Sequence, residues 1–179
     1  MERQAIVQLL RDNYQDFVGY MQSLSDADFS YAPPGEWCAG QQLDHLVRTV
    51  SRVLVAVKQP IFILKLFFGK PRRPKMDYQQ VVGAYKKELE QGGPTAKRYL
   101  PDGKKFLAHR EVQIADLTRL VNELADRVMA ITEEDLDQTR LPHPRLGKLS
   151  LREMMYFTAY HFVNHREGIE ANLLKQNTY

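Results

Sequence analysis

The chain has 179 residues, of which 44% are hydrophobic and 26% are charged, and these are the proportions of an ordinary globular protein. They exclude a disordered or low-complexity chain, and the length predicts a single domain, residues 1–179, with room for an elaboration. The formal charge of +3 is too small to indicate a nucleic-acid partner, because the basic residues are scattered apart from one cluster, GKPRRPK at 69–75.

Cysteine usage and hydropathy predict a cytoplasmic protein with no membrane partner. Cys38 is the single cysteine, and the first residues, MERQAIVQLLRDNYQ, do not have the basic start and apolar centre of a secretion signal. The most apolar run, PIFILKLFF at 60–68, is interrupted by Lys65 and is shorter than the roughly 20 residues that a spanning helix needs. Its basic neighbours would also suit a membrane-surface patch, but we favour a segment that packs on the rest of the fold.

The first half of the chain predicts two amphipathic helices. Apolar residues recur at spacings of three and four over about 3–24 and again over about 39–58, where Pro60 ends the pattern. Between them, SDADFSYAPPGEW contains two prolines and a glycine, so the chain must leave helical geometry there. The predicted apolar stripes consist of Ile6, Leu10, Tyr14, Phe17, Met21 and Leu24, and of Leu43, Leu46, Val47, Val50, Leu54 and Val57.

Residues 59–105 form the least regular part of the sequence. They contain the apolar run, the basic cluster, a predicted helix from Tyr78 to Gln91 that begins at Asp77 as its N-cap, and a GGP sequence. We interpret this segment as an insertion between the second and third helices of a bundle. A connection of this length allows those two helices to run parallel, as in an up-down-down-up bundle.

The second half of the chain predicts two more bundle helices. The third covers about 105–130, with a stripe of Ile114, Leu117, Val121, Leu124 and Val128. LPHPRLGKL indicates a loop, after which Ser150 and Glu153 have the spacing of a capping box that begins a fourth helix ending near Leu174. No segment alternates with a period of two, so the sequence predicts no strands and an all-α four-helix bundle.

Two histidines lie four residues apart in MMYFTAYHFVNHREG. A helical wheel places His161 and His165 on one apolar face, and side chains at this spacing can reach the same ion, because their Cβ atoms lie within roughly 6 Å. A single buried histidine is usually an ordinary core residue, but two on one apolar face have nitrogens that need partners. A metal site and a pair of core-edge histidines therefore both remain possible.

A metal site would need a third ligand from elsewhere in the chain, and the candidates are His45, His109 and His143. His143 lies in the proline-flanked loop and is expected to be solvated, whereas His109 lies at the margin of the third stripe. His45 lies about 140° from the centre of the second stripe, so periodicity places it toward solvent unless that side lines a wet pocket.

Two motifs resemble those of the DinB/YfiT-like superfamily of small metal-binding four-helix bundles. They are EWCAGQQLDHL, with a tryptophan at a helix start and His-Leu eight residues later, and LSLREMMYFTAYHFVNHREGI, a capped helix with His-x-x-x-His. The resemblance spans essentially the whole chain, helix order included. It implies that His45, His161 and His165 are metal ligands in a pocket open to solvent, and that the protein is a homodimer. The chain departs from the family pattern at Cys38, where members commonly have Ser or Thr, and we expect Cys38 to be structural.

The resemblance also implies a class of activity. Three nitrogen ligands leave coordination positions open, as in catalytic sites, and imidazole favours zinc or nickel, with manganese or iron as further possibilities. Related proteins include thiol-dependent transferases and metal-dependent hydrolases. The resemblance therefore implies an S-transferase that acts on a small-molecule substrate with a low-molecular-weight thiol, with a metal-dependent hydrolase as one alternative and a non-catalytic dimeric stress-related metal-binding protein as another.

The sequence indicates few other functional residues. Arg110 and Gln113 fall on the inward side of the third helix and could contact an anionic substrate group, but for Arg110 we favour a position at the edge of the stripe with its charged end in water. No general base is evident. The apolar run at 60–68 could provide a dimer surface or a lid over the pocket.

Overall fold

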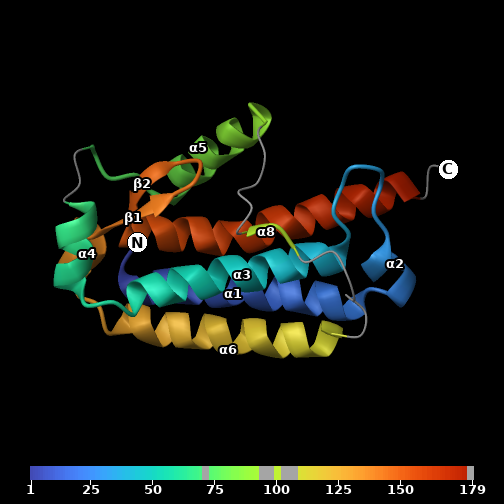
Figure 1. Ribbon diagram of the computed structural model, residues 1–179, viewed down its shortest axis with the longest axis horizontal. Coiled ribbons are helices and arrows are strands. Elements are labelled where there is room, and N and C mark those ends of the chain that lie inside the picture. Colours follow the sequence, from blue (N-terminus) through green and yellow to red (C-terminus); the bar gives the residue numbers. More distant parts are fainter. Residues whose placement is uncertain (70–72, 93–98, 102–108, 177–179) are drawn as a thin grey trace.

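The computed structural model describes residues 1–69, 73–92, 99–101 and 109–176, and these are mainly helical (Figure 1). The predicted start of the third bundle helix near residue 105 and part of the basic cluster at 69–75 lie outside these ranges. The elements in chain order are α1 (Arg3–Ser23), α2 (Asp26–Ser30), α3 (Ala39–Val57), α4 (Ile61–Phe68), α5 (Tyr78–Glu90), α6 (Arg110–Met129), α7 (Glu133–Gln138), β1 (Arg140–His143), β2 (Gly147–Ser150) and α8 (Leu151–Gln176).

Four long helices, α1, α3, α6 and α8, form the predicted bundle. α1 packs on α6 and α8, and α3 packs on the same two helices. Figure 1 shows α1 and α8 running in one direction and α3 and α6 in the other, which confirms the up-down-down-up order. At one end, Arg127 Nε on α6 donates to the carbonyl oxygen of Val57 (2.9 Å), which joins the C-terminal ends of the parallel helices α3 and α6.

The predicted stripes form the core of the bundle. Almost all of their residues are buried, whereas Leu24 and Val47 are only partly buried and pack against the edge of the core. α8 contributes a continuous buried stretch near its beginning, from Glu153 to Phe162, because it is covered by α1 on one side and by α5 on another. The apolar periodicity of the bundle helices is thus explained by burial on one face of each helix.

The prediction of no strands is wrong for the segment before α8. β1 and β2 form an antiparallel hairpin in which Arg140 pairs with Ser150 and His143 with Gly147, and Gly147 has a φ of +68°. Each strand is only four residues long, so it shows too few alternations to give a periodic signal. Leu141 and Leu149 are opposite each other and both buried, so tertiary packing holds the hairpin in place.

Two short helices lie in segments of similar sequence, SLSDADF and AITEEDL. α2 begins at Ser25, whose side chain accepts a hydrogen bond from the Asp28 amide, and α7 begins at Thr132, which does the same for Asp135. These N-caps satisfy amides that have no partner within the helix. α2 is a single short helix in the segment predicted to be non-helical, and its five residues are too few for a periodic pattern.

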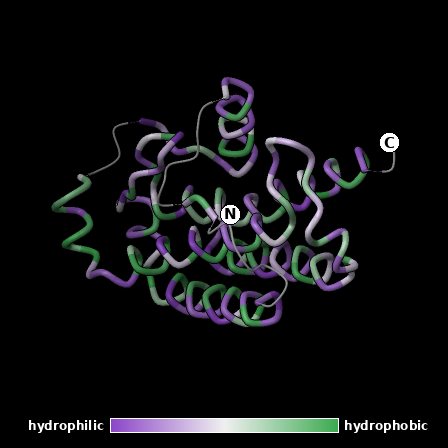
Figure 2. The backbone as a smooth tube through the Cα atoms, turned by 45° about the vertical axis from the view of Figure 1, so that its right-hand side comes forward, coloured by the Kyte–Doolittle hydropathy of each residue, from purple (hydrophilic) through white to green (hydrophobic). Residues whose placement is uncertain are grey.

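The described part of the insertion contains two helices, α4 and α5. The predicted helix from Tyr78 to Gln91 is confirmed as α5, and the apolar run at 60–68 forms a second helix, α4. α5 packs on α8, and α4 packs on β1. Leu64 turns inward and is 3% exposed, whereas Phe62, Leu66 and Phe67 on the outer side of α4 are 70–78% exposed. Figure 2 shows α4 as a mostly hydrophobic coil at the edge of the molecule.

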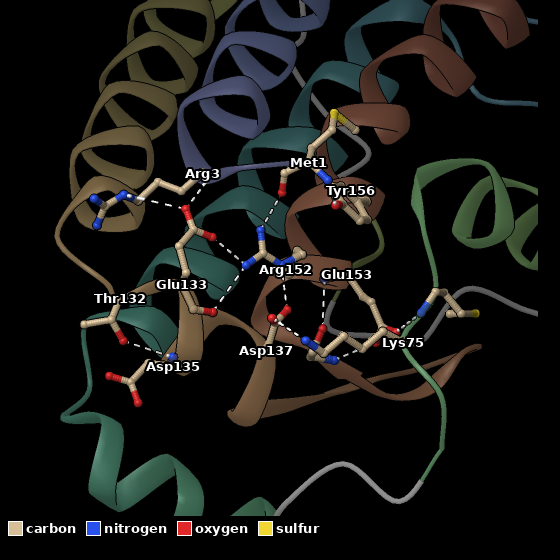
Figure 3. Close-up of polar contacts among 12 residues, drawn as sticks. Met1, Arg3, Lys75, Thr132, Glu133, Asp135, Asp137, Arg152, Glu153 and Tyr156 are labelled. Carbon is tan, nitrogen blue, oxygen red and sulfur yellow. Dashed lines mark hydrogen bonds and ion pairs between the residues drawn. The ribbon is translucent and has the colours of Figure 1, made fainter.

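A cluster of ion pairs fixes the insertion to the start of α8 (Figure 3). The Glu153 carboxylate accepts two hydrogen bonds from Arg73 (both 2.9 Å) and one each from the amides of Met76 and Ser150 (both 2.8 Å). The Glu153 amide in turn donates to Ser150 Oγ (3.1 Å), so the predicted capping box is confirmed. Lys75 pairs with Asp137 nearby (2.6 Å).

Candidate metal centre

Three histidines from two helices meet in the interior. One ring nitrogen from each of His45, His161 and His165 lies within 4.8 Å of the other two. The ring centroids are 4.5–5.2 Å apart, and all three residues are buried. The structure therefore brings together the three residues that the resemblance selected.

His45 is buried, although the helical wheel of α3 placed it toward solvent. The reason is that neighbouring segments cover the polar side of α3. The ring of Trp37, which lies before α3, is 5.2 Å from the His45 ring, and Tyr99 lies against the same imidazole. Periodicity within one helix cannot show this cover, because it comes from residues outside that helix.

Hydrogen bonds at Nδ1 orient two of the rings. His45 Nδ1 donates to the carbonyl oxygen of Tyr99 (2.7 Å), and a carbonyl can only accept, so the proton is on Nδ1. His165 Nδ1 likewise donates to Gln42 Oε1 (2.8 Å), and the Gln42 amide nitrogen donates to the carbonyl oxygen of Trp37 (3.2 Å). In both rings, Nε2 keeps its lone pair, as a metal ligand requires.

The two α8 histidines meet through Nε2. Their Nε2 atoms are 3.0 Å apart, and because the His165 proton is on Nδ1, His161 Nε2 donates this hydrogen bond and His165 Nε2 accepts it. Metal binding by His161 Nε2 would require its proton to move to Nδ1, which gives the other neutral tautomer. Nitrogen ligands at 2.0–2.1 Å from a tetrahedral zinc ion are themselves separated by about 3.3 Å, so the observed spacing fits two ligands of one ion. The donor set of three imidazoles also suits zinc and its neighbours in the transition series, so the residues present fit a metal.

Burial keeps the three histidines neutral. Loss of hydration lowers the pKa of His45, and it lowers the pKa of His161 and His165 well below the ordinary value. For His161 a second cause is repulsion by the neighbouring histidines in their charged forms. Because a proton and a metal ion compete for the same lone pair, rings that stay neutral are available as ligands at pH 7.

The other two histidine candidates lie outside this cluster. His109 is exposed at the start of α6. His143 is not solvated as expected, because the hairpin folds its ring onto Phe157, with centroids 4.2 Å apart. Its Nδ1 accepts hydrogen bonds from the amides of Arg145 (3.2 Å) and Leu146 (3.0 Å), and burial lowers its pKa to about 4.

The remaining candidates are structural. Arg110 donates to the carbonyl oxygens of Met21 and Leu24 at the end of α1, so its charged end is neither in water nor beside the histidines. Gln113 donates to Asp44 (3.3 Å) between α6 and α3. Cys38 is buried at the start of α3, where its amide donates to Gln41 Oε1 (3.0 Å).

A pocket of about 820 Å³ opens beside the three histidines. All three line it, together with residues from α4, α5, the hairpin and α8. Sequence reasoning missed Tyr85 on its wall and Gln42 behind His165, and it expected His143, which also lines the pocket, to be solvated. Gln42 could have been found, since it precedes His45 by three residues and so shares its side of α3.

Comparisons with known proteins place the chain in a family. A family model of the DinB superfamily matches residues 9–169. A solved structure, YfiT from Bacillus subtilis, has the same fold, with a TM-score of 0.63. Its sequence is 13% identical, and the match covers 98% of this chain and 88% of that chain. YfiT is described as a probable metal-dependent hydrolase with an unusual four-helix bundle topology. No curated protein matches the chain significantly. No helix among the described residues is long and apolar enough to cross a membrane. The chain belongs to the DinB superfamily.

Proposed function

We propose that His45, His161 and His165 bind a divalent transition metal and that the protein is a metal-dependent enzyme. The observation that carries this proposal is the convergence of three buried, neutral imidazoles beside a pocket, two of them with Nδ1 already hydrogen-bonded. Zinc and nickel suit these ligands best, and manganese and iron are further candidates. Three protein ligands leave room for a substrate atom.

We place thiol transfer ahead of hydrolysis. The bound metal would supply the Lewis acidity that makes a thiol or a water molecule nucleophilic at neutral pH. Among the described residues, no carboxylate joins the histidine cluster, and Glu88 is the one acidic residue on the pocket wall. A thiol has a pKa of about 8.5, whereas a water molecule has a pKa of about 15.7. A thiol therefore loses its proton more easily and depends less on a general base, and the carboxylates described above do not provide one.

The chain's own residues would orient the site and exclude water. The Tyr99 carbonyl and the Gln42 amide fix the His45 and His165 rings. Trp37 packs on His45, and Phe157 packs on His161 with centroids 4.8 Å apart, so aromatic rings border the cluster. A small-molecule substrate would approach from the pocket.

Hydrolysis is the second candidate function. It is favoured by the description of YfiT as a probable metal-dependent hydrolase, together with the shared fold. In that case the nucleophile would be water, and the substrate would be an ester, amide or similar compound. Both reactions would use the same three histidines.

Metal content is the first test. Untagged protein, incubated with zinc, nickel or manganese and then dialysed, is expected to hold about one equivalent of metal by elemental mass spectrometry. His161→Ala should lose it, whereas His109→Ala, which changes an exposed histidine, should keep it. Parent protein that stays metal-free with every ion would contradict the proposal.

An activity test then separates the two reactions. The loaded protein is incubated with a panel of low-molecular-weight thiols and 1-chloro-2,4-dinitrobenzene, and separately with p-nitrophenyl esters. Thiol transfer predicts conjugate formation that His161→Ala abolishes, and hydrolysis predicts release of p-nitrophenol with the same dependence. If the metal-loaded protein forms neither product, the result would favour the non-catalytic metal-binding alternative.

Two further features are proposals that stem from the family resemblance: assembly as a homodimer and location in the cytoplasm. Light scattering on the eluting protein should give about twice the chain mass of 20.8 kDa. A mass of one chain would contradict the dimer. Fractionation of the source cells tests the location.

A further inference from the structure

The pocket extends away from the histidines into an apolar chamber. Its wall includes Val53 and Ala56 from α3, Leu64 from α4, and Met154 and Phe157 from α8. Leu64, Met154 and Phe157 are at most 7% exposed, so these apolar groups are held in the interior. The volume of about 820 Å³ lies within the range of sites that enclose small molecules.

The insertion and the hairpin complete the chamber beside α3 and α8, and ionic and hydrogen bonds hold these two segments in place. Lys148 Nζ on β2 donates to the carbonyl oxygen of Phe68 (3.0 Å) at the end of α4. Lys65 on α4 pairs with Asp135 on α7 (2.6 Å). Arg145 donates to the carbonyl oxygen of Gly92 (3.1 Å) just beyond α5. A wall tied at several points needs little reorganisation when a ligand enters.

The charged residues on the pocket wall lie toward its outer side. Arg52 is exposed, and Glu88 and Arg145 are half-buried. The Arg145 guanidinium donates to the carbonyl oxygens of Glu88 (3.4 Å) and Gly92 (3.1 Å). The buried part of the wall is mainly apolar, and this disfavours a ligand that carries charge along its length.

We propose that the substrate of this site has an apolar body that occupies the chamber, with its reacting polar group beside His45, His161 and His165. This inference rests on the proposed metal-dependent function and adds the chemical class of the substrate. In a thiol transfer, the apolar compound is the electrophile. The reactive carbon forms a bond to the thiol sulfur, the bond to its leaving group breaks, and the leaving group departs with that electron pair while the thiol proton goes to solvent.

Straight-chain alkyl hydroxamates test the proposal, because the hydroxamate group binds zinc while the chain probes the chamber. Dissociation constants for the zinc-loaded protein are measured by calorimetry from acetohydroxamate to decanohydroxamate. Affinity is expected to rise about threefold to fourfold for each added methylene and then to level off when the chamber is full. Constants for acetohydroxamate and octanohydroxamate that agree within twofold would overturn the proposal.

Two variants narrow the chamber without touching the histidines. Ala56→Phe and Val53→Phe should each remove the affinity that long alkyl hydroxamates gain over acetohydroxamate, while the affinity for acetohydroxamate itself stays as in the parent. Leu66→Ala is the matched control, since Leu66 lies on the outer side of α4 and is 78% exposed. Its chain-length dependence should equal that of the parent. Thermal unfolding checks that both Phe variants are folded. If long hydroxamates still gained their full affinity in both variants, the alkyl chain would bind outside the chamber, and the proposal would be overturned.

A metal-free arm separates failure of the chamber from failure of the metal site. Nile red is bound to the protein after chelation, and 1-decanol is added as competitor. Displacement that Ala56→Phe weakens and Leu66→Ala does not would support the chamber even if hydroxamates fail to bind. If 1-decanol does not displace Nile red, and if hydroxamate affinity does not depend on the length of the alkyl chain, the chamber proposal is contradicted and the metal proposal stays intact.

Discussion

Two polar clusters lie on α8, and they are completed in different ways. At its start, Glu153 and Arg152 are surrounded by partners of opposite charge: Arg73 for Glu153, and Glu133 and Asp137 for Arg152 (Figure 3). About two turns further along, His161 and His165 face His45, and all three are neutral. The first cluster contains its own counter-charges, whereas the second brings together imidazole nitrogens that can bind a metal.

The difference explains what each region can do. Every oxygen of Glu153 already accepts hydrogen bonds from Arg73 or from backbone amides, so this cluster joins the insertion to the bundle. The Nε2 atoms of His161 and His165 are 3.0 Å apart, and both can bind one ion once the His161 proton moves to Nδ1. A polar cluster satisfied by the protein itself stabilises the fold, and one that needs an external partner binds a ligand.

At neutral pH, the largest expected effect on stability comes from breaking the ionic cluster. Glu153→Ala leaves Arg73 without its carboxylate and two amides without an acceptor. We expect the free energy of unfolding in urea to fall by about 3 kcal/mol, the lower end for a buried pair because Arg73 is partly exposed. Glu167→Ala, at an exposed position on α8, should change it by less than about 0.5 kcal/mol. A Glu153→Ala protein as stable as the parent would show that the cluster does not hold the fold.

Adding metal tests the second cluster. Zinc at one hundred times its dissociation constant should raise the free energy of unfolding by about 2.7 kcal/mol, because it binds the folded state alone. Chelation should reverse the effect, and His161→Ala should abolish it. Equal stabilisation of the parent and His161→Ala would mean that zinc binds elsewhere.

The hydrogen bonds behind the histidines should tune metal affinity. Gln42→Leu removes the acceptor of His165 Nδ1, and zinc affinity, measured by competition with a chromophoric chelator, should fall about 10-fold to 100-fold. Gln41→Leu is the matched control, since the Gln41 side chain accepts from the Cys38 amide at the start of α3 (3.0 Å) instead of from a histidine. Unchanged affinity in Gln42→Leu would contradict an orienting role for Gln42.

His143 predicts the acid sensitivity of the metal-free protein. Its pKa is lowered to about 4, so between pH 6.5 and 4 the unfolded chain binds a proton that the folded protein does not. The free energy of unfolding should therefore fall as the pH falls through this window, by about 1.4 kcal/mol per pH unit for this residue. Between pH 6.5 and 4, the free energy of unfolding of His143→Gln should fall less steeply with pH than that of the parent, by about that amount. Above pH 6.5 the two proteins should show the same dependence on pH. His109→Gln should follow the parent, and a slope for His143→Gln equal to that of the parent would contradict the prediction.

The sequence alone determined the bundle and two of the three histidines. Long apolar stripes at helical spacing predict helices, because a helix in a small protein buries one face. Ser150 and Glu153 marked the start of α8, because capping depends on residues three apart. His161 and His165 were paired for the same local reason, since a helix places residues four apart on one side.

Only the tertiary structure decided the rest. His45 is buried because Trp37 and Tyr99 cover it, and His143 is buried because the hairpin packs on α8; neither contact leaves a local pattern. The hairpin itself is too short for periodicity to show. The neutral state of the histidines and the chamber beside them arise from burial by segments far apart in the chain, and burial is a property of the folded molecule as a whole.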